Sequence, residues 1–262
     1  GVSSVTAPIY ISEMTKSENR GSLGVLYQFS LVFGILIAFI SNYLLTGFDG
    51  DNDWRWMLGV EAIPAFIYFL LTIYLPESPR WLILFKNDDL TAKKVLKEIY
   101  LNQIEADAVL KSIKLTDNDK LVENKLFTLR FKKTIILAFL ISFFNQLSGI
   151  NFILYYAPEI LEMGGFATKE SLFNSVIIGL TNIVFTFGGL MLIDRLGRRQ
   201  LLIIGSIGYI IGLSGVSSAF YFDLIPQLIA FFIFLFIAAH AIGQGTVIWV
   251  FISEIFPNRI RA

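Results

Sequence analysis

Long runs without charged residues alternate with short polar segments along the chain. Runs that contain no Asp, Glu, Lys or Arg cover residues 21–48, 134–158, 171–193, 200–222 and 224–253, and the run 56–76 contains only Glu61. A helix needs about 20 apolar residues to cross the hydrocarbon core of a bilayer, and each run reaches that length. Residues 1–12 are apolar enough to be the end of another spanning helix. We therefore expect about seven membrane crossings, the first of them truncated.

The composition agrees with a membrane protein that has little soluble mass. Only 16% of the 262 residues are charged, whereas a soluble domain usually carries about 25%. The chain starts with Gly inside an apolar segment, so we interpret it as an internal piece of a longer protein. It has no cysteine, and no His cluster, nucleophile–base pair or phosphate-binding loop is visible. The sequence therefore predicts neither an enzyme nor a cofactor or metal site.

Positive charge follows the runs in a regular alternation. Of the 21 Lys and Arg residues, 19 lie in alternate loops: Lys16 and Arg20, twelve residues from Arg80 to Lys133, Arg195, Arg198 and Arg199, and Arg259 and Arg261. The other loops hold only Arg55 and Lys169, and the loop 46–53 is acidic. Because basic loops stay in the cytoplasm, we expect 46–53, 162–170 and 222–226 to face the outside and the basic loops to face the inside.

The long basic loop, roughly 86–130, is the only part that we expect to lie in water. Apolar residues recur at helical spacing in two stretches of this loop, which predicts two short amphipathic helices at the cytoplasmic face. Their Lys residues fit a solvated face, with phospholipid binding as the alternative. We expect residues 1–79 to end an N-terminal six-helix half, 80–131 to form a cytoplasmic linker, and 132–262 to form most of a C-terminal half.

Two segments that lie 241 residues apart resemble each other. YISEMTKSENRG covers residues 10–21 and FISEIFPNRIRA covers residues 251–262. Each places a Glu at the cytoplasmic end of a helix and an Arg seven residues later, namely Glu13 with Arg20 and Glu254 with Arg261. A parallel repeat in a membrane protein indicates two similar halves around an axis along the membrane normal.

The run 134–158 contains the polar sequence SFFNQLSGINFILYYAP at residues 142–158. Amide side chains in hydrocarbon are costly unless they are hydrogen-bonded. They can serve helix packing, since amide bonds between spanning helices are common, or they can bind a ligand. At 100° per residue no straight helix presents Asn145, Gln146 and Asn151 on one face. Gly149 permits a break, and interrupted helices mark binding sites in transporters, with Tyr155 on the same face as Asn151.

Five motifs give the chain a specific resemblance. They are PIYISE with RG at 8–21, PESPRWL at 76–82, NQLSGIN with YYAP at 145–158, DRLGRR at 194–199 and WVFISEIFP at 249–257. In these motifs the chain resembles the sugar porter family of the major facilitator superfamily, which includes glucose facilitators and bacterial sugar–proton symporters. The resemblance implies an all-α, polytopic membrane protein of the major facilitator fold. The chain then holds spans four to ten of twelve.

The same resemblance implies a function and a site. It predicts transport of a monosaccharide by alternating access, coupled to protons, by a monomer in the cell (inner or plasma) membrane. An uncoupled facilitative carrier and a sugar sensor of the same fold are the alternatives. Positions that match the family's sugar contacts are Gln28, Gln146, Asn151, Asn182 and Trp249, whose indole can stack on a pyranose. Asn145 stands where many members have Gln, and Thr246 stands where many have a Pro that kinks the span.

Charged and titratable residues in or near the spans suggest further roles. Glu61 is the only acid within a complete span, and an intramembrane acid is a functional candidate by default. It could load a proton or bond a neighbouring helix. The lone His240 is expected to serve helix packing. By resemblance, a cytoplasmic gate is formed by Glu13, Arg20, Asp194, Arg195, Arg198, Arg199, Glu254 and Arg261.

Overall fold

The computed structural model describes residues 2–16, 20–100, 102–118, 131–248 and 251, and these are helical with no β-strand among them. The α-helices are α1 (Val2–Glu13), α2 (Arg20–Leu45), α3 (Asp53–Val60), α4 (Ala62–Ile73), α5 (Pro79–Trp81), α6 (Asp89–Tyr100), α7 (Gln103–Asn118), α8 (Lys132–Leu147), α9 (Ile150–Tyr155), α10 (Ala157–Met163), α11 (Thr168–Leu196), α12 (Arg198–Tyr221) and α13 (Pro226–His240). Short helices of other types are the 3₁₀ turn η2 (Gly50–Asn52) and the π-helical turns η3 (Leu82–Lys86) and η5 (Ala241–Gly245). The expected all-α class is confirmed.

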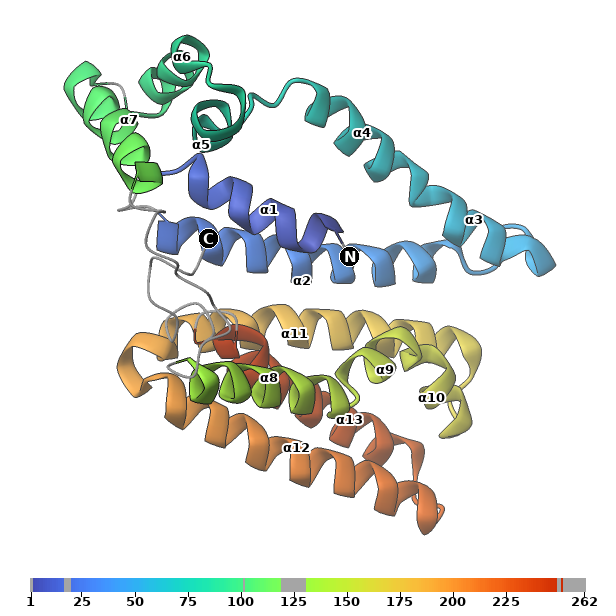
Figure 1. The fold of residues 1–262 in the computed structure, drawn as a ribbon. Coiled ribbons are helices and arrows are strands. Elements are labelled where there is room, and N and C mark those ends of the chain that lie inside the picture. Colours follow the sequence, from blue (N-terminus) through green and yellow to red (C-terminus); the bar gives the residue numbers. More distant parts are fainter. Residues whose placement is uncertain (1, 17–19, 101, 119–130, 249–250, 252–262) are drawn as a thin grey trace.

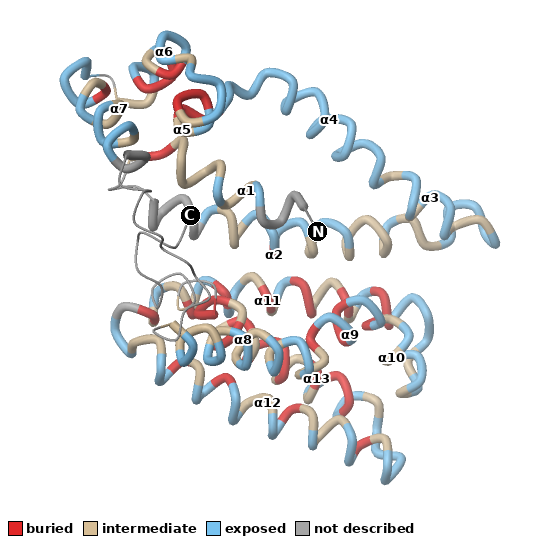
Figure 2. Tube along the Cα trace, in the orientation of Figure 1, coloured by how far each residue is buried: buried red, intermediate tan, exposed pale blue. Residues whose placement is uncertain are grey.

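Six segments are long and apolar enough to cross a membrane within the described part of the chain. They are Leu26–Leu45, Gly50–Ile73, Lys132–Tyr155, Thr168–Ile193, Arg198–Tyr221 and Pro226–Ile248. They coincide with the six complete charge-poor runs, and α1 corresponds to the shorter first one. Apolar side chains on α4 such as Phe66 and Leu71 are more than 60% exposed, and Figure 2 shows α4 exposed along its length. Such a surface suits lipid, because hydrocarbon is the solvent around a spanning helix.

The helices form two groups that meet along α2 and α11. Figure 1 shows α1 to α4 on one side and the bundle of α8 to α13 on the other. The ring of Phe29 on α2 lies 5.2 Å from that of Phe187 on α11, measured between centroids. A Cβ atom at Gly179 of α11 would stand 3.0 Å from Phe39. Small residues let spanning helices approach closely, so this contact is the junction between the two groups.

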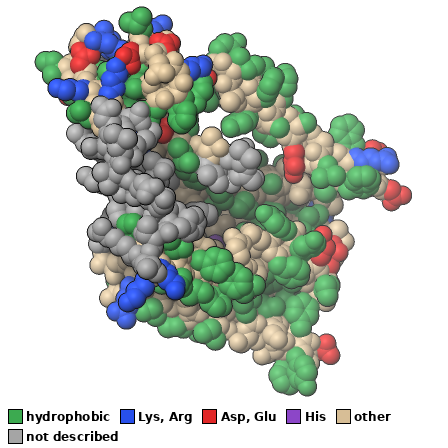
Figure 3. Space-filling view, in the orientation of Figure 1, with side chains coloured by type: hydrophobic (Ala, Val, Ile, Leu, Met, Phe, Trp, Pro, Cys, Tyr) green, Lys and Arg blue, Asp and Glu red, His purple; other side chains and the backbone are tan. Residues whose placement is uncertain are grey.

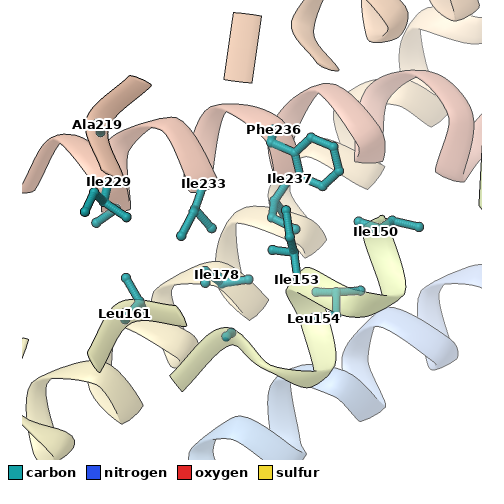
Figure 4. Packing of buried hydrophobic residues seen from close by; sticks show 12 residues of the cluster. Ile150, Ile153, Leu154, Leu161, Ile178, Ala219, Ile229, Ile233, Phe236 and Ile237 are labelled. Carbon is teal, nitrogen blue, oxygen red and sulfur yellow. The ribbon is translucent and has the colours of Figure 1, made fainter. Parts of the chain in front are cut away.

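The apolar core of the second group lies between α9, α10, α11 and α13. Figure 4 shows Ile150 and Ile153 of α9 beside Ile237 of α13, with Ile178 of α11 below them. Ile178 and Ile237 are completely buried. This packing fixes α9 and α10 against the bundle, so the end of the seventh predicted span is anchored by its apolar face.

The linker helices lie at the end of the molecule where positive charge gathers. Ala92 and Val95 of α6 are buried against Leu110 and Ile113 of α7, which confirms the predicted amphipathic pair in the described residues. Lys93 pairs with Asp107 at 2.6 Å. Lys and Arg side chains cluster around these helices and at the α11–α12 turn (Figure 3). The alternation of basic and acidic ends therefore agrees with the predicted orientation.

The start of α6 is held by a charged cap. The Asp88 carboxylate accepts hydrogen bonds from the backbone N–H and the hydroxyl of Thr91, at 3.0 and 2.7 Å. Because these bonds favour the ionised form, they lower the pKa of Asp88. The cap anchors the linker helix at its first turn.

Candidate functional site

The seventh predicted span is broken where its amides lie. Helix α8 ends at Leu147, Gly149 adopts a φ of 80°, and α9 begins at Ile150. This left-handed conformation suits glycine, because a Cβ atom there would clash with the backbone. The Ser148 hydroxyl donates a hydrogen bond to the carbonyl of Asn145 at 2.6 Å, which satisfies one backbone group at the end of α8. The break expected at Gly149 is confirmed.

The break brings two predicted site residues into contact. The Asn151 Nδ2 group donates a hydrogen bond to Gln146 Oε1 at 2.8 Å, and both side chains are exposed. On a straight helix, residues five apart would point about 140° away from each other. Each amide uses one of its groups in this bond and keeps others for a ligand. The pair thus forms a polar surface at the interruption of a spanning helix.

Asn145 faces a different place from its neighbour Gln146. It lines a cavity of about 300 Å³ together with Ser206 and Tyr209 of α12 and Gln244 of η5. The Nε2 group of Gln244 donates to the Ser206 hydroxyl at 3.0 Å. Among the described residues, Asn145 Oδ1 and Gln244 Oε1 are buried without a hydrogen-bond partner. Two acceptors in this cavity are therefore available to hydrogen-bond donors.

Sequence reasoning missed Gln244, Ser206 and Tyr209. Each is a polar residue inside a charge-free run, and this feature could have marked them as candidate site residues. What could not be seen was that α12 and η5 bring them to the face of α8 that carries Asn145.

The other predicted sugar contacts are distributed over three elements. Gln28 is half-buried on α2, and Asn182 is 4% exposed on α11, the helix that α2 packs against. Tyr155 ends α9 and is 74% exposed. In the described part of the chain, no hydrogen bond joins these three to the Gln146–Asn151 pair. Trp249 lies outside the described residues, and Thr246 donates its hydroxyl proton to the carbonyl of Ala241 at 2.6 Å.

Glu61 stands at an interruption of its own span. Helix α3 ends at Val60 and α4 begins at Ala62, with Pro64 in its first turn. The Glu61 side chain is exposed. An acid at this depth of a spanning segment is accessible to a proton or to a neighbouring polar group.

The described part of the chain includes some of the predicted gate residues. Glu13 ends α1 and accepts a hydrogen bond from the Ser78 hydroxyl at 2.5 Å, so it contacts the PESPR motif. Arg195 and Arg199 are exposed at the α11–α12 turn, and Arg198 donates to the carbonyl of Ile193 at 3.5 Å. Arg20 starts α2, and Asp194 lies in the last turn of α11. Glu254 and Arg261 lie outside the described residues, so the gate stays a prediction.

Comparison with known proteins places the whole chain among transporters. A family of sugar (and other) transporters matches residues 1–262. The chain is similar to the D-xylose-proton symporter of Escherichia coli K12 (35% identical over 268 residues, 100% of this chain and 54% of the relative). It is equally similar to the galactose-proton symporter of that strain (35% over 268 residues, 100% and 57%). The arabinose-proton symporter of Bacillus subtilis is 33% identical over 274 residues (100% and 58%).

A solved structure shows the same arrangement of helices. The xylose transporter of Escherichia coli, in a partially occluded inward-open conformation, matches with a TM-score of 0.86 at 32% identity, over 100% of this chain and 56% of that one. The chain spans about half the length of the curated relatives it matches.

Proposed function

Since the chain belongs to the family of sugar (and other) transporters, we propose that the protein carries a monosaccharide, a hexose or a pentose, across the cell membrane by alternating access and together with a proton. The observation that carries this proposal is the Gln146–Asn151 pair at the break of a spanning helix. The relatives named above are called sugar–proton symporters, which favours coupled transport over a sensor or an uncoupled carrier.

The chemistry of the pair suits a neutral solute that is rich in hydroxyl groups. Amides offer donors and acceptors without a net charge, so they match a sugar better than an ion or an acid. The sugar replaces the bond between Gln146 and Asn151 with bonds to its own hydroxyls, and Asn145 Oδ1 accepts a further one. Gln28, Asn182 and Tyr155 complete the polar wall, and the indole of Trp249 stacks on the apolar face of the ring.

The movement is a rocking of the two helix groups about the contact between α2 and α11. Discontinuous helices near the middle of the membrane move with one group and expose the site to each side in turn. One copy of the chain is sufficient for this movement, because both groups belong to it, and we propose that the protein works as a monomer in the bilayer.

Uptake by the complete protein tests the proposal. We would reconstitute it in liposomes with an inward proton gradient and measure uptake of labelled D-xylose, arabinose, galactose and glucose. Accumulation of at least one sugar is expected, and it should be lost in Gln146→Ala. Gln227→Ala, which removes an exposed amide at the outer end of α13, should leave uptake unchanged. If none of these sugars is transported or bound, the proposal is wrong.

Glu61 is the proton-coupling group in this proposal. Glu61→Gln in the complete protein should abolish accumulation against a gradient while exchange of sugar survives, because the amide cannot release a proton. Counterflow measures exchange and gradient-driven uptake measures accumulation, and both are measured on the same vesicles. Glu159→Gln, at an exposed acid in α10, is the control. A Glu61→Gln protein that still accumulates sugar excludes this role.

The gate predicts a shift between conformations. Glu254 should form a charge-assisted network with Arg195, Arg198 or Arg199 when the cytoplasmic side is closed, so Glu254→Ala should favour the inward-open form. Residues 1–262 contain no cysteine, so labelling of one cysteine introduced on their cytoplasmic side reports the change. Unchanged labelling in a folded Glu254→Ala protein contradicts the gate.

A further inference from the structure

Helix α6 of the linker has two different faces, and only one of them is buried. The buried face carries Ala92 and Val95, which pack against α7. On the opposite side, Leu90, Lys94 and Lys97 recur at helical spacing, so they form one line along the helix, called here the α6 stripe. All three side chains are exposed, and Leu90 is exposed to 84%.

The acids of the linker helices are mostly engaged away from the α6 stripe. Three ion pairs join them to lysines that lie off the stripe, namely Asp107 with Lys93, Asp89 with Lys114, and Glu105 with Lys16. Within the described part of the chain, Lys94 and Lys97 form no ion pair, and neither does Glu98, the acid that follows them. The stripe thus presents two cations without an acidic partner among these residues, beside an exposed leucine.

The linker is held next to the membrane from two sides. Residues 74–78 alone separate the end of α4 at Ile73 from the start of α5 at Pro79, and a connection of this length reaches at most about 20 Å. Helix α4 ends a segment that is long enough to cross a bilayer. From the other side, Glu13 at the end of α1 accepts the hydrogen bond of Ser78. The linker therefore lies close to the headgroups, at the basic end of the molecule (Figure 3).

Exposed aromatic side chains lie between α4 and α6 along the chain. Tyr74 directly follows α4 and is 83% exposed, and Phe85 of η3 is 73% exposed. The Nζ atom of Lys86 lies over the ring of Trp81, 4.4 Å from its centroid. Aromatic rings and lysines with apolar stems are typical of the region between hydrocarbon and water. Along the chain, these residues connect the lipid-exposed surface of α4 with the α6 stripe.

We propose that the α6 stripe docks on anionic phospholipid headgroups of the cytoplasmic leaflet, with Lys94 and Lys97 at the phosphates and Leu90 in the boundary below them. The proposal does not depend on the sugar site. Lysines near a negatively charged leaflet are attracted to it, and an apolar side chain that enters the boundary is removed from water. An acidic soluble partner could use the same charges, but it would not bring Leu90 into lipid.

Helix α7 offers a comparison surface of similar chemistry. Ile104, Lys111 and Leu115 recur at helical spacing opposite its buried face, and the two apolar side chains are 79% and 56% exposed. Lys111 also has no ion pair among the residues that the structure describes. Figure 1 shows α5 and α6 between α7 and the end of α4, so we expect the exposed face of α7 to lie in water.

A fluorescent reporter in the complete protein tests the docking. Any other cysteine is removed, and the apolar dye bimane is attached to Leu90→Cys in α6 or to Leu115→Cys in α7. The proteins are placed in nanodiscs of phosphatidylcholine, alone or with about one third phosphatidylglycerol, and both kinds of disc carry spin-labelled lipid as a quencher. Quenching at position 90 should rise about threefold or more in the anionic discs and fall again at high salt. Quenching at position 115 should stay low.

Charge variants identify the cause of the quenching. Lys94→Gln together with Lys97→Gln should lower the docking constant at position 90 about ten- to thirtyfold, because each lysine near an anionic leaflet contributes about fivefold. Lys111→Gln in α7 is the matched control and should change nothing. Glutamine keeps the helix propensity of lysine, and circular dichroism confirms that each variant is folded.

Each outcome decides the proposal. Stronger quenching at position 90 in anionic discs, lost when both Lys94 and Lys97 are replaced, supports it. Quenching that is equal in the two kinds of disc, or equal at positions 90 and 115, overturns it. Quenching that persists in the double variant also overturns it, because charge would not be the cause. If position 90 stays unquenched while an acidic soluble protein binds there, the stripe serves a protein partner and the lipid proposal is wrong.

Discussion

The seam between α12 and α13 and the broken span α8–α9 are built in opposite ways. Along the seam, a Cβ atom at Gly212 would stand 2.9 Å from the Cβ of Phe236, and one at Gly205 would stand 3.0 Å from the carbonyl oxygen of Ala239. Along the broken span, such a Cβ at Gly149 would have no atom within 4 Å from any residue beyond its chain neighbours. Glycine therefore serves close contact between backbones in one place and a change of chain direction in the other.

The comparison indicates that the α12–α13 seam contributes mainly to stability, whereas the broken span is suited to ligand binding. In lipid, helices associate through close packing and hydrogen bonds rather than through the hydrophobic effect. The seam between α12 and α13 is held by close packing along its length. The broken span presents the exposed amides of Gln146 and Asn151, so these side chains can exchange their hydrogen-bond partners.

The largest expected effect is on the seam. Gly212→Val would force a branched side chain into the backbone of α13 at Phe236, which we expect to lower the free energy of unfolding by about 1–3 kcal/mol or more. Thermal unfolding in detergent measures it. Gly34→Val is the matched control, because a Cβ atom at Gly34 has nothing within 4 Å. Equal melting temperatures for the two variants would mean that the seam does not carry the stability assigned to it.

The next effect is on affinity, with stability preserved. Gln146→Ala removes a proposed hydrogen-bond partner of the sugar. This loss should cost about 1–3 kcal/mol in a desolvated site and weaken binding roughly ten- to a hundredfold. Trp249→Ala should act similarly through lost stacking. Calorimetry beside melting curves of the sugar-free protein checks both. A large fall in stability with unchanged affinity would mean that Gln146 serves packing. The broken span would then contribute to stability as the seam does.

The smallest expected effect concerns Gly149, the residue at which the span is broken. Gly149→Ala places a Cβ atom on a residue with a φ of 80°, which costs about 1–2 kcal/mol through backbone sterics and favours straightening of the break. We expect weaker sugar binding with a modest loss of stability. Gly59→Ala, in α3 with open space around it, is the control. If Gly149→Ala binds sugar as the parent does, the break is not needed for the binding geometry.

The spans and the break could be predicted because their causes are local in sequence. A run without charge is long enough to cross lipid wherever it packs, and a glycine after Asn145 and Gln146 permits a left-handed residue in any fold. Gln146 and Asn151 were correctly placed near the break. Their mutual hydrogen bond depends on the bend itself, which the 100° spacing of a straight helix does not describe.

The parts that could not be predicted depend on contacts between helices. The cavity of Asn145 exists because Ser206 and Gln244 arrive from α12 and η5. His240 was expected to serve packing, and its ring contact with Tyr209 agrees with that role, but its partner lies 31 residues away. The domain boundaries 1–79, 80–131 and 132–262 stay a prediction.

In the transport cycle proposed above, the bond between Gln146 and Asn151 has a consequence for the protein when no sugar is bound. A symporter completes its cycle only if the empty protein reorients and returns the site to the first side of the membrane. Two amides that satisfy each other can pass through the closed, poorly solvated conformation without a ligand, because neither exposes its bonded donor or acceptor to a medium of low polarity. If the pair binds the sugar as proposed, its mutual bond also lowers the barrier of the return step.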